Sequence, residues 1–484
     1  MECDVSLCYN MLVQETNGGE NMLEIISVYY KKITAFLVSM LMLFATSLLG
    51  DIPRAKNPIV AEKTNYVFDT DRILIGGYGC NISQTDDEHM QYVVDAGIDF
   101  LVSAANKEFL DACARFGIGV IAKNFGGLPT YGWTYIDRTD QCPWLTFTLE
   151  DFVDHPALWG NDLMDEPAAD SFPYLARMVD SYYSKTNGKI AYINLYPSYA
   201  NEEQLGTKAD WFAFSKDYQR ISSYQKHVNA YIETVGTDYI SVDIYPLKQR
   251  TDKATGKPYK YCEPTWLKNL DILAKACRDT NRDLWVITQV TGMPFEGDSV
   301  TRIADEADIR WQAYTALSFG AKAIIHACYQ EGWWDESSHL ITRDGQRNPV
   351  YFYVQAVNRE IKALSDAYSD YKNIGAFVLN AYKESHTRIA LSKVEFKAIS
   401  DLQSEDTLLV GCFEAKEGDS KAFTMVNMNE ISKNDRADAK FKLNGASSVT
   451  VYRAGVPSEL TPDADGFYSL SLAPGEGVFV TVDY

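Results

Sequence analysis

Between Arg72 and about Tyr371, short apolar runs alternate with stretches of helical amphipathic periodicity. A buried run followed by an amphipathic helix is the pattern of a parallel βα unit. The eight apolar runs are Ile73–Gly77, Asp99–Ala104, Gly119–Lys123, Leu158–Met164, Ile190–Leu195, Tyr239–Tyr245, Leu284–Gln289 and Ala321–Cys328. The helical stretches are Asp87–Ala96, Lys107–Phe116, Phe172–Tyr183, Ser222–Val235, Leu267–Arg278, Asp305–Phe319 and Val350–Ala367.

Eight such units predict an α/β fold in which the strands close into a (β/α)8 barrel, over residues 72–371. A doubly wound open sheet is the alternative, but no glycine-rich phosphate loop follows the first run. After Tyr371 the pattern changes to short alternating strands separated by turn residues, which predicts a small all-β sandwich over residues 372–484. These strands are Thr407–Cys412, Ala422–Asn427, Ala439–Leu443, Val449–Tyr452, Tyr468–Leu470 and Val478–Val482.

The first 50 residues form an N-terminal extension, followed by a linker at 51–71. The segment Ile33–Leu49 is almost entirely apolar, follows Lys31 and Lys32, and precedes a polar stretch. This arrangement indicates a signal peptide or a membrane anchor, and its length fits both. No cysteine follows soon after it, which argues against a lipid-anchored lipoprotein. We therefore expect a secreted or cell-surface protein.

Charge and composition limit the classes of partner. The chain has 484 residues, with 45 Lys and Arg against 66 Asp and Glu, and the formal net charge of -21 argues against nucleic acid. Neutral glycans remain open as partners. The nine cysteines are scattered without CxxC spacing, and the six histidines show no metal-ligand spacing. No metal site and no cofactor are predicted, and the absence of a G-x-S-x-G elbow disfavours a serine esterase.

Polar residues gather where the predicted strands end, which is where a (β/α) barrel carries its reacting groups. The fourth run ends in Asp165 and Glu166, and Pro167 stops its hydrogen-bond ladder. The next helix starts later, near Ser171, so helix capping is the weaker interpretation of the two carboxylates. An apolar wall and a neighbouring like charge would raise the pKa of such a carboxyl group, as a general acid at neutral pH requires.

The tripeptide Asp165-Glu166-Pro167 resembles the Asn-Glu-Pro or Asp-Glu-Pro acid/base motif of clan A glycoside hydrolases. The stretch from Asp344-Gly345 to Asn358-Arg359-Glu360-Ile361 is similar to the barrel exit of family 42 beta-galactosidase-like proteins, and the barrel also looks family 5-like. The resemblance covers roughly Ile73 to the C-terminus. It implies a glycosidase acting on oligo- or polysaccharide, in which Glu166 protonates the glycosidic oxygen and later activates water.

The family pattern also expects a glutamate nucleophile at the end of the seventh strand, where this sequence has Gln289. An amide cannot form the usual glycosyl ester, so three interpretations remain open. In the first, another carboxylate supplies the second group, and Glu331 is placed ahead of Asp243 and Glu296.

In the second interpretation, the 2-acetamido group of the substrate is the nucleophile, with Asp165 orienting it and Glu166 acting as the acid. The adjacent pair resembles that of N-acetylhexosaminidases that use this route. In the third, the protein binds glycans on the same barrel without hydrolysing them.

Other strand-end residues are predicted to contact the sugar. Amide side chains donate and accept hydrogen bonds, as a sugar hydroxyl does, and aromatic rings can stack on sugar rings. The predicted contacts are Asp165, Asn124, Asn194, Tyr196, Tyr245, Gln289, Trp333 and Trp334.

Overall fold

The computed structural model describes residues 58–60, 71–123, 125–126, 147–148, 152–186, 188–210, 213, 215–292, 299–332, 336–430 and 434–484. The predicted N-terminal extension, with its apolar segment, lies outside the described residues, and so does nearly all of the linker. Four residues singled out in the sequence also lie outside them: Asn124, Glu296, Trp333 and Trp334. No helix in the described part of the chain is both long and apolar enough to cross a membrane.

Eight parallel strands form a closed barrel, which confirms the predicted fold class. The strands are β1 (Leu74–Tyr78), β2 (Phe100–Ser103), β3 (Gly119–Ala122), β6 (Leu158–Asp165), β7 (Ile190–Leu195), β8 (Tyr239–Asp243), β11 (Asp283–Gln289) and β13 (Ala321–Ala327). Each pairs with the barrel strands before and after it in the chain, and β13 pairs with β1 to close the ring.

Helices follow most barrel strands, because their apolar stripes cover the outer face of the sheet. They are α3 (Asp87–Asp95), α4 (Lys107–Phe116), α6 (Phe172–Lys185), α7 (Glu202–Leu205), α8 (Lys216–Thr234), α9 (Trp266–Thr280), α10 (Glu306–Ser318) and α11 (Pro349–Ser369). Local sequence sets their ends. The side chain of Asn106 caps α4 by accepting from the backbone N–H of Phe109 at 2.8 Å, and Gly117 ends that helix in the left-handed conformation.

Aromatic side chains fill the interior of the barrel below its mouth. The rings of Tyr239 on β8 and Trp285 on β11 stack with their centroids 4.4 Å apart. Phe100 on β2 lies between Trp285, at 5.6 Å, and Trp159 on β6, at 6.0 Å. All but Trp159, which is partly buried, are fully buried. The barrel is therefore a packed core, and polar chemistry is restricted to its ends.

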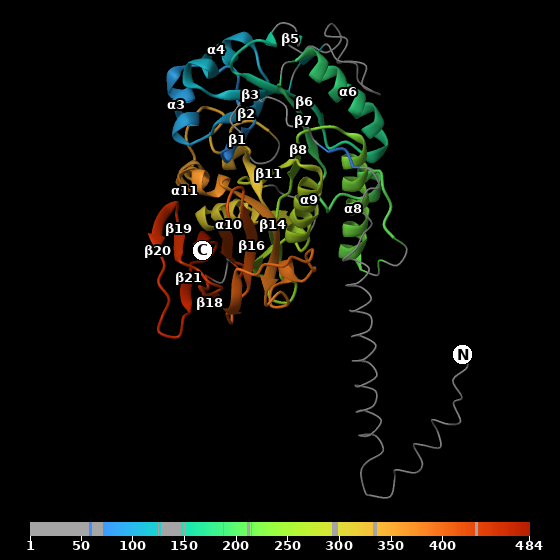
Figure 1. Cartoon of the computed structure of the whole chain (residues 1–484). Helices are drawn as coiled ribbons and strands as arrows, with labels where there is room; N and C mark the ends of the chain where they lie inside the picture. The colour runs from blue at the N-terminus through green and yellow to red at the C-terminus, as the bar shows by residue number, and fades with distance from the viewer. Residues whose placement is uncertain are drawn as a thin grey trace, which may run out of the picture. The chain divides into compact units, whose positions relative to one another are not determined.

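Two antiparallel sheets follow the barrel, as the alternating C-terminal strands predicted. The larger sheet has the order β14 (Tyr371–Leu379), β16 (Leu408–Ala415), β17 (Lys421–Asn427), β22 (Gly477–Asp483), β19 (Ser448–Arg453) and β20 (Val456–Glu459). The smaller sheet has the order β15 (Ile399–Gln403), β18 (Ala437–Leu443) and β21 (Tyr468–Leu472). One apolar cluster draws residues from both sheets, and the larger sheet also contacts α10 (Figure 1).

A third antiparallel sheet, which the sequence did not predict, is built from segments that follow two barrel strands. Its order is β10 (Pro258–Cys262), β9 (Leu247–Thr251) and β12 (Ser299–Thr301). The strands β9 and β12 come directly after the carboxyl ends of β8 and β11 in the chain. This sheet therefore lies at the end of the barrel where polar strand ends gather. A two-stranded pairing of β4 (Phe125–Gly126) with β5 (Phe147–Thr148) follows β3.

Candidate active site

The carboxyl end of β6 brings three acidic residues to the barrel mouth: Asp162, Asp165 and Glu166. Glu166 has a left-handed backbone with φ of 48°, and its N–H donates to the carbonyl of Asn194 at 2.8 Å. Among residues other than glycine, asparagine is a type that tolerates the left-handed conformation. For a glutamate the same conformation costs on the order of 1–3 kcal/mol. Its surroundings must therefore hold Glu166 in place. Such strain is most common at functional sites.

Asn194 on β7 connects the carboxylates of two other strands. Its Nδ2 donates to Asp243 Oδ1 at 2.9 Å and to Asp165 Oδ1 at 3.3 Å, while its Oδ1 accepts from Ser241 Oγ at 3.1 Å. Both amide protons are thus directed at carboxylates from β6 and β8. In this structure Asn194 positions the acidic groups, a role that the sequence prediction of a sugar contact did not include.

Glu166 and Asp243 have raised pKa values. Burial, then Asp243 and Asp165, raise the pKa of Glu166 from 4.5 to about 8. Burial and the charge of Asp165 raise the pKa of Asp243 to about 7, although hydrogen bonds from Asn194 and Tyr245 act against the shift. Asp165 is the exposed member of the group, and Asp243 is only 8% exposed. The site therefore holds acids that still carry protons near neutral pH.

Asp162 is a further member of this acidic group that the sequence analysis did not single out. Burial raises its pKa to about 7; Lys123 lowers it, and Asp165 raises it further. Lys123 Nζ lies 3.9 Å from Asp162 Oδ2, donates to the hydroxyl of Tyr78, and sits 4.3 Å from the centroid of that ring. A charged residue inside the apolar run 158–164 was the signal that could have identified Asp162.

Tyrosines form the rest of the described surroundings. Tyr196 is partly buried, and burial together with the charges of Glu166, Asp165 and Asp243 raises its pKa. Tyr245 is buried, and its hydroxyl acts on Asp243. Both residues were predicted to contact a sugar, and the structure places both beside the carboxylates.

Gln289, at the end of β11, faces the backbone of the neighbouring segments. Its Nε2 donates to the carbonyls of Arg302 at 2.6 Å and Leu247 at 3.1 Å, and its Oε1 accepts from the N–H of Leu247 at 2.9 Å. The side chain is fully buried. It ties β9 and the segment after β12 to the barrel, so both of its N–H donors are unavailable to a sugar. We do not retain Gln289 as a substrate contact.

Glu331 follows β13 and is exposed. Its backbone N–H donates to the carbonyl of Gly79 at 3.2 Å, and its charge contributes to the raised pKa of Cys80. The charges that raise the pKa of Glu166 are those of Asp243 and Asp165. The structure therefore brings Asp243 into the acidic group with Glu166. The remaining predicted contacts, Asn124, Trp333 and Trp334, lie outside the described residues.

No protein-family model and no curated protein sequence matches the chain. Solved glycoside hydrolases are similar to it in fold. A beta-galactosidase from Bacillus circulans sp. alkalophilus is 9% identical with a TM-score of 0.46, covering 85% of this chain and 99% of its own. A family 42 beta-galactosidase from G. stearothermophilus is 9% identical with a TM-score of 0.45, covering 87% and 99%. A family 30 subfamily 8 xylanase from Clostridium acetobutylicum is 12% identical with a TM-score of 0.39, covering 85% and 97%.

Proposed function

We propose that this protein is a glycosidase in which Glu166 is the general acid. The observation that carries the proposal is a partly buried carboxylic acid with a pKa of about 8, at the carboxyl end of a barrel strand and electrostatically linked to Asp243 and Asp165. Cleavage of a glycosidic bond releases an alcohol, and this leaving group must be protonated as the bond breaks. The reaction therefore requires an acid that keeps its proton at pH 7. The substrate class is oligo- or polysaccharide.

In the reaction, protonated Glu166 donates its proton to the glycosidic oxygen as the bond to the anomeric carbon breaks. In a retaining reaction, the Glu166 carboxylate formed in this step then takes a proton from the water that attacks the glycosyl-enzyme intermediate. Asp243 replaces Glu331 as our first choice for the second carboxylate, because its charge acts on Glu166 and Asn194 holds its orientation. In a retaining reaction Asp243 attacks the anomeric carbon, and in an inverting reaction it takes the proton of the attacking water.

A second mechanism is favoured by the different exposure of the two aspartates. Asp165 is exposed at the barrel mouth, whereas Asp243 is buried. In substrate-assisted cleavage, the carbonyl oxygen of a 2-acetamido group attacks the anomeric carbon while Glu166 protonates the leaving oxygen. Asp165 would orient the acetamido N–H, and water would then open the cyclic intermediate.

Aryl glycosides test the role of Glu166. We expect Glu166→Gln to lower kcat on unactivated oligosaccharides by about 100-fold or more. The loss should shrink on aryl glycosides whose leaving groups depart without protonation, and added azide should restore part of the turnover. Equal losses on every leaving group would show that Glu166 is not the acid.

The substrate panel separates the two mechanisms. Turnover restricted to 2-acetamido-2-deoxy glycosides, abolished by Asp165→Asn and retained by Asp243→Asn, supports the substrate-assisted route. Turnover of simple glycosides abolished by Asp243→Asn supports the two-carboxylate route. Glycan binding without turnover in the wild type would instead identify a noncatalytic binding protein and refute the glycosidase proposal.

Export through the segment Ile33–Leu49 is also a proposal. It would place the barrel outside the cytoplasm, where polysaccharides are accessible. Cell fractionation, with and without residues 1–50, tests it: the full chain should be secreted or membrane-associated, and the truncated chain should remain in the cytoplasm.

A further inference from the structure

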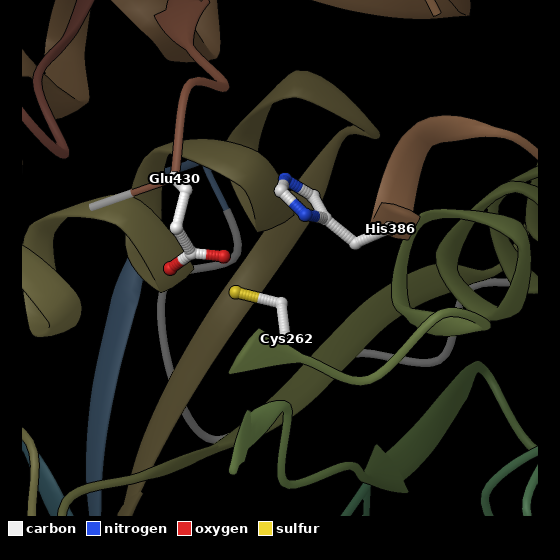
Figure 2. A group of neighbouring side chains, drawn as sticks. All are labelled: Cys262, His386 and Glu430. Atoms are coloured by element: carbon white, nitrogen blue, oxygen red, sulfur yellow. The ribbon is translucent and has the colours of Figure 1, made fainter. Parts of the chain in front are cut away.

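Three buried side chains with metal-binding atoms converge between the sheet formed by β9, β10 and β12 and the C-terminal sheets. They are Cys262, His386 and Glu430. Their exposed fractions are 1%, 2% and 9%. One ligand atom from each, the Sγ, an imidazole nitrogen and a carboxylate oxygen, lies within 4.8 Å of those of the other two. Figure 2 shows the three side chains pointing toward one another from different segments of the chain.

Each of these residues is held by its own segment. Cys262 is the last residue of β10 and is paired in register with Leu247 of β9. His386 lies in the short 3-10 helix Ser385–Thr387, and its ring meets that of Trp311 on α10 edge to face, with the centroids 5.7 Å apart. Glu430 follows β17 and is buried with the others.

Arg302 is close enough to act electrostatically on Cys262, but its guanidinium forms a two-point ion pair with the buried Asp308. A thiolate, an imidazole and a carboxylate are the side-chain ligands that zinc takes in proteins, and here one ligand atom of each kind lies in the same buried space. A divalent cation between the three groups would bind all of them.

We infer that Cys262, His386 and Glu430 form a zinc site that joins the β9–β10 hairpin to the C-terminal sheets. Zinc accepts sulfur, nitrogen and oxygen ligands together, whereas magnesium and calcium require oxygen ligands and copper(I) prefers sulfur. In a tetrahedral zinc site, ligand atoms lie about 3.5 Å apart, so no pair of ligand atoms needs to approach by more than about 1.3 Å on binding. The Cys262 thiol releases its proton to solvent as the sulfur–zinc bond forms.

A water molecule or the carboxylate of Glu384 completes the set of four ligands. Glu384 is two residues from His386, and its charge acts on Cys262. The burial of the three ligands points to a structural role for the metal. Because Cys262 pairs with Leu247, which Gln289 fastens to β11, the metal would also stiffen the segment that follows Asp243.

The test uses the full chain without a polyhistidine tag, stripped of metal and titrated with Co²⁺ as a spectroscopic probe. We expect one equivalent of Co²⁺ to give a sulfur-to-metal charge-transfer band and tetrahedral d–d bands, and Zn²⁺ to displace it. Absence of the charge-transfer band in the wild type would overturn the inference without reference to any variant.

Variants identify the ligands. Cys262→Ser should lose the charge-transfer band, and His386→Gln and Glu430→Gln should weaken Zn²⁺ binding by about 100-fold or more. The control Cys412→Ser removes another buried thiol, in the core of the C-terminal sheets, and should bind as the wild type does. Chelation should lower the Tm of the wild type and of Cys412→Ser but not that of Cys262→Ser. Equal binding by Cys262→Ser and the wild type would refute the site.

Discussion

Replacing Asp165 with asparagine should lower the pKa of Glu166 without disturbing the site. Asp165 is exposed and is one of the two charges that raise the pKa of Glu166. Asparagine has the same shape and keeps an oxygen that accepts from Asn194. The substitution therefore removes a charge and little else.

The expected fall in the pKa of Glu166 follows from the repulsion between its charge and that of Asp165. Raising the pKa of Glu166 from 4.5 to about 8 changes its protonated fraction at pH 7 from about 0.3% to about 90%. Burial is the largest cause and remains in the variant. Two unit charges about 6 Å apart in an effective dielectric of about 40 to 80 repel by about 0.7–1.4 kcal/mol, or about 0.5–1 pH unit. The pKa of Glu166 in Asp165→Asn should therefore fall to between about 7 and 7.5.

Carbon-13 NMR of glutamate side-chain carboxyls measures the pKa of Glu166 and does not require a known substrate. The resonance that disappears in Glu166→Gln identifies Glu166, and its titration is followed in the wild type and in Asp165→Asn. Asp170→Asn removes another exposed carboxylate just beyond the site and should leave the titration unchanged. A wild-type midpoint near 4.5, or identical midpoints in the wild type and Asp165→Asn, would refute this reasoning.

Two further substitutions probe the residues around the site. The folded-state pKa of Asp162, about 7, lies above its ordinary value of 3.8, so its contribution to stability is complete below pH 3.8 and is lost as the pH rises through 7. Asp162→Asn should therefore raise the Tm at pH 8 and change it less at pH 5, and thermal melts showing the reverse order would contradict the raised pKa. Gln289→Glu should lower the free energy of unfolding by about 2–5 kcal/mol, because it removes the donors to the carbonyls of Leu247 and Arg302. Urea denaturation measures this loss, and an unchanged free energy of unfolding would show that Gln289 does not hold these backbone groups.

The barrel could be predicted because its strands are buried on both faces and therefore form continuous apolar runs. All eight runs coincide with barrel strands, as in Ile190–Leu195, which matches β7. The sheet formed by β9, β10 and β12 was missed for the opposite reason. The sequence of β9, LKQRT, is mostly polar, so it shows neither an apolar run nor a clear alternation. In the structure, the last two residues of this strand are exposed.

Asp165, Glu166 and Asp243 could be located from sequence because barrel topology directs strand ends to one edge, whereas Asp162, inside the fourth strand, was not singled out. The roles of the amide residues could not be assigned in this way. Asn194 and Gln289 both end strands, and each can bond equally well to a sugar, a carboxylate or a backbone carbonyl. Only the packing shows that Asn194 joins two aspartates and that Gln289 holds Leu247. The cluster of Cys262, His386 and Glu430 has no local spacing to detect, since its members are far apart in the chain.

Gln289 ends β11 with an amide, and that amide fastens the start of β9. The negative charge of the mouth is instead carried by β6 and β8, whose carboxylates Asn194 links. Asp243 acts on Glu166, and Asp165 acts on both of them, so the protons of Glu166 and Asp243 are lost as those of an interacting pair. Any reaction at this site therefore depends on how many protons that pair holds.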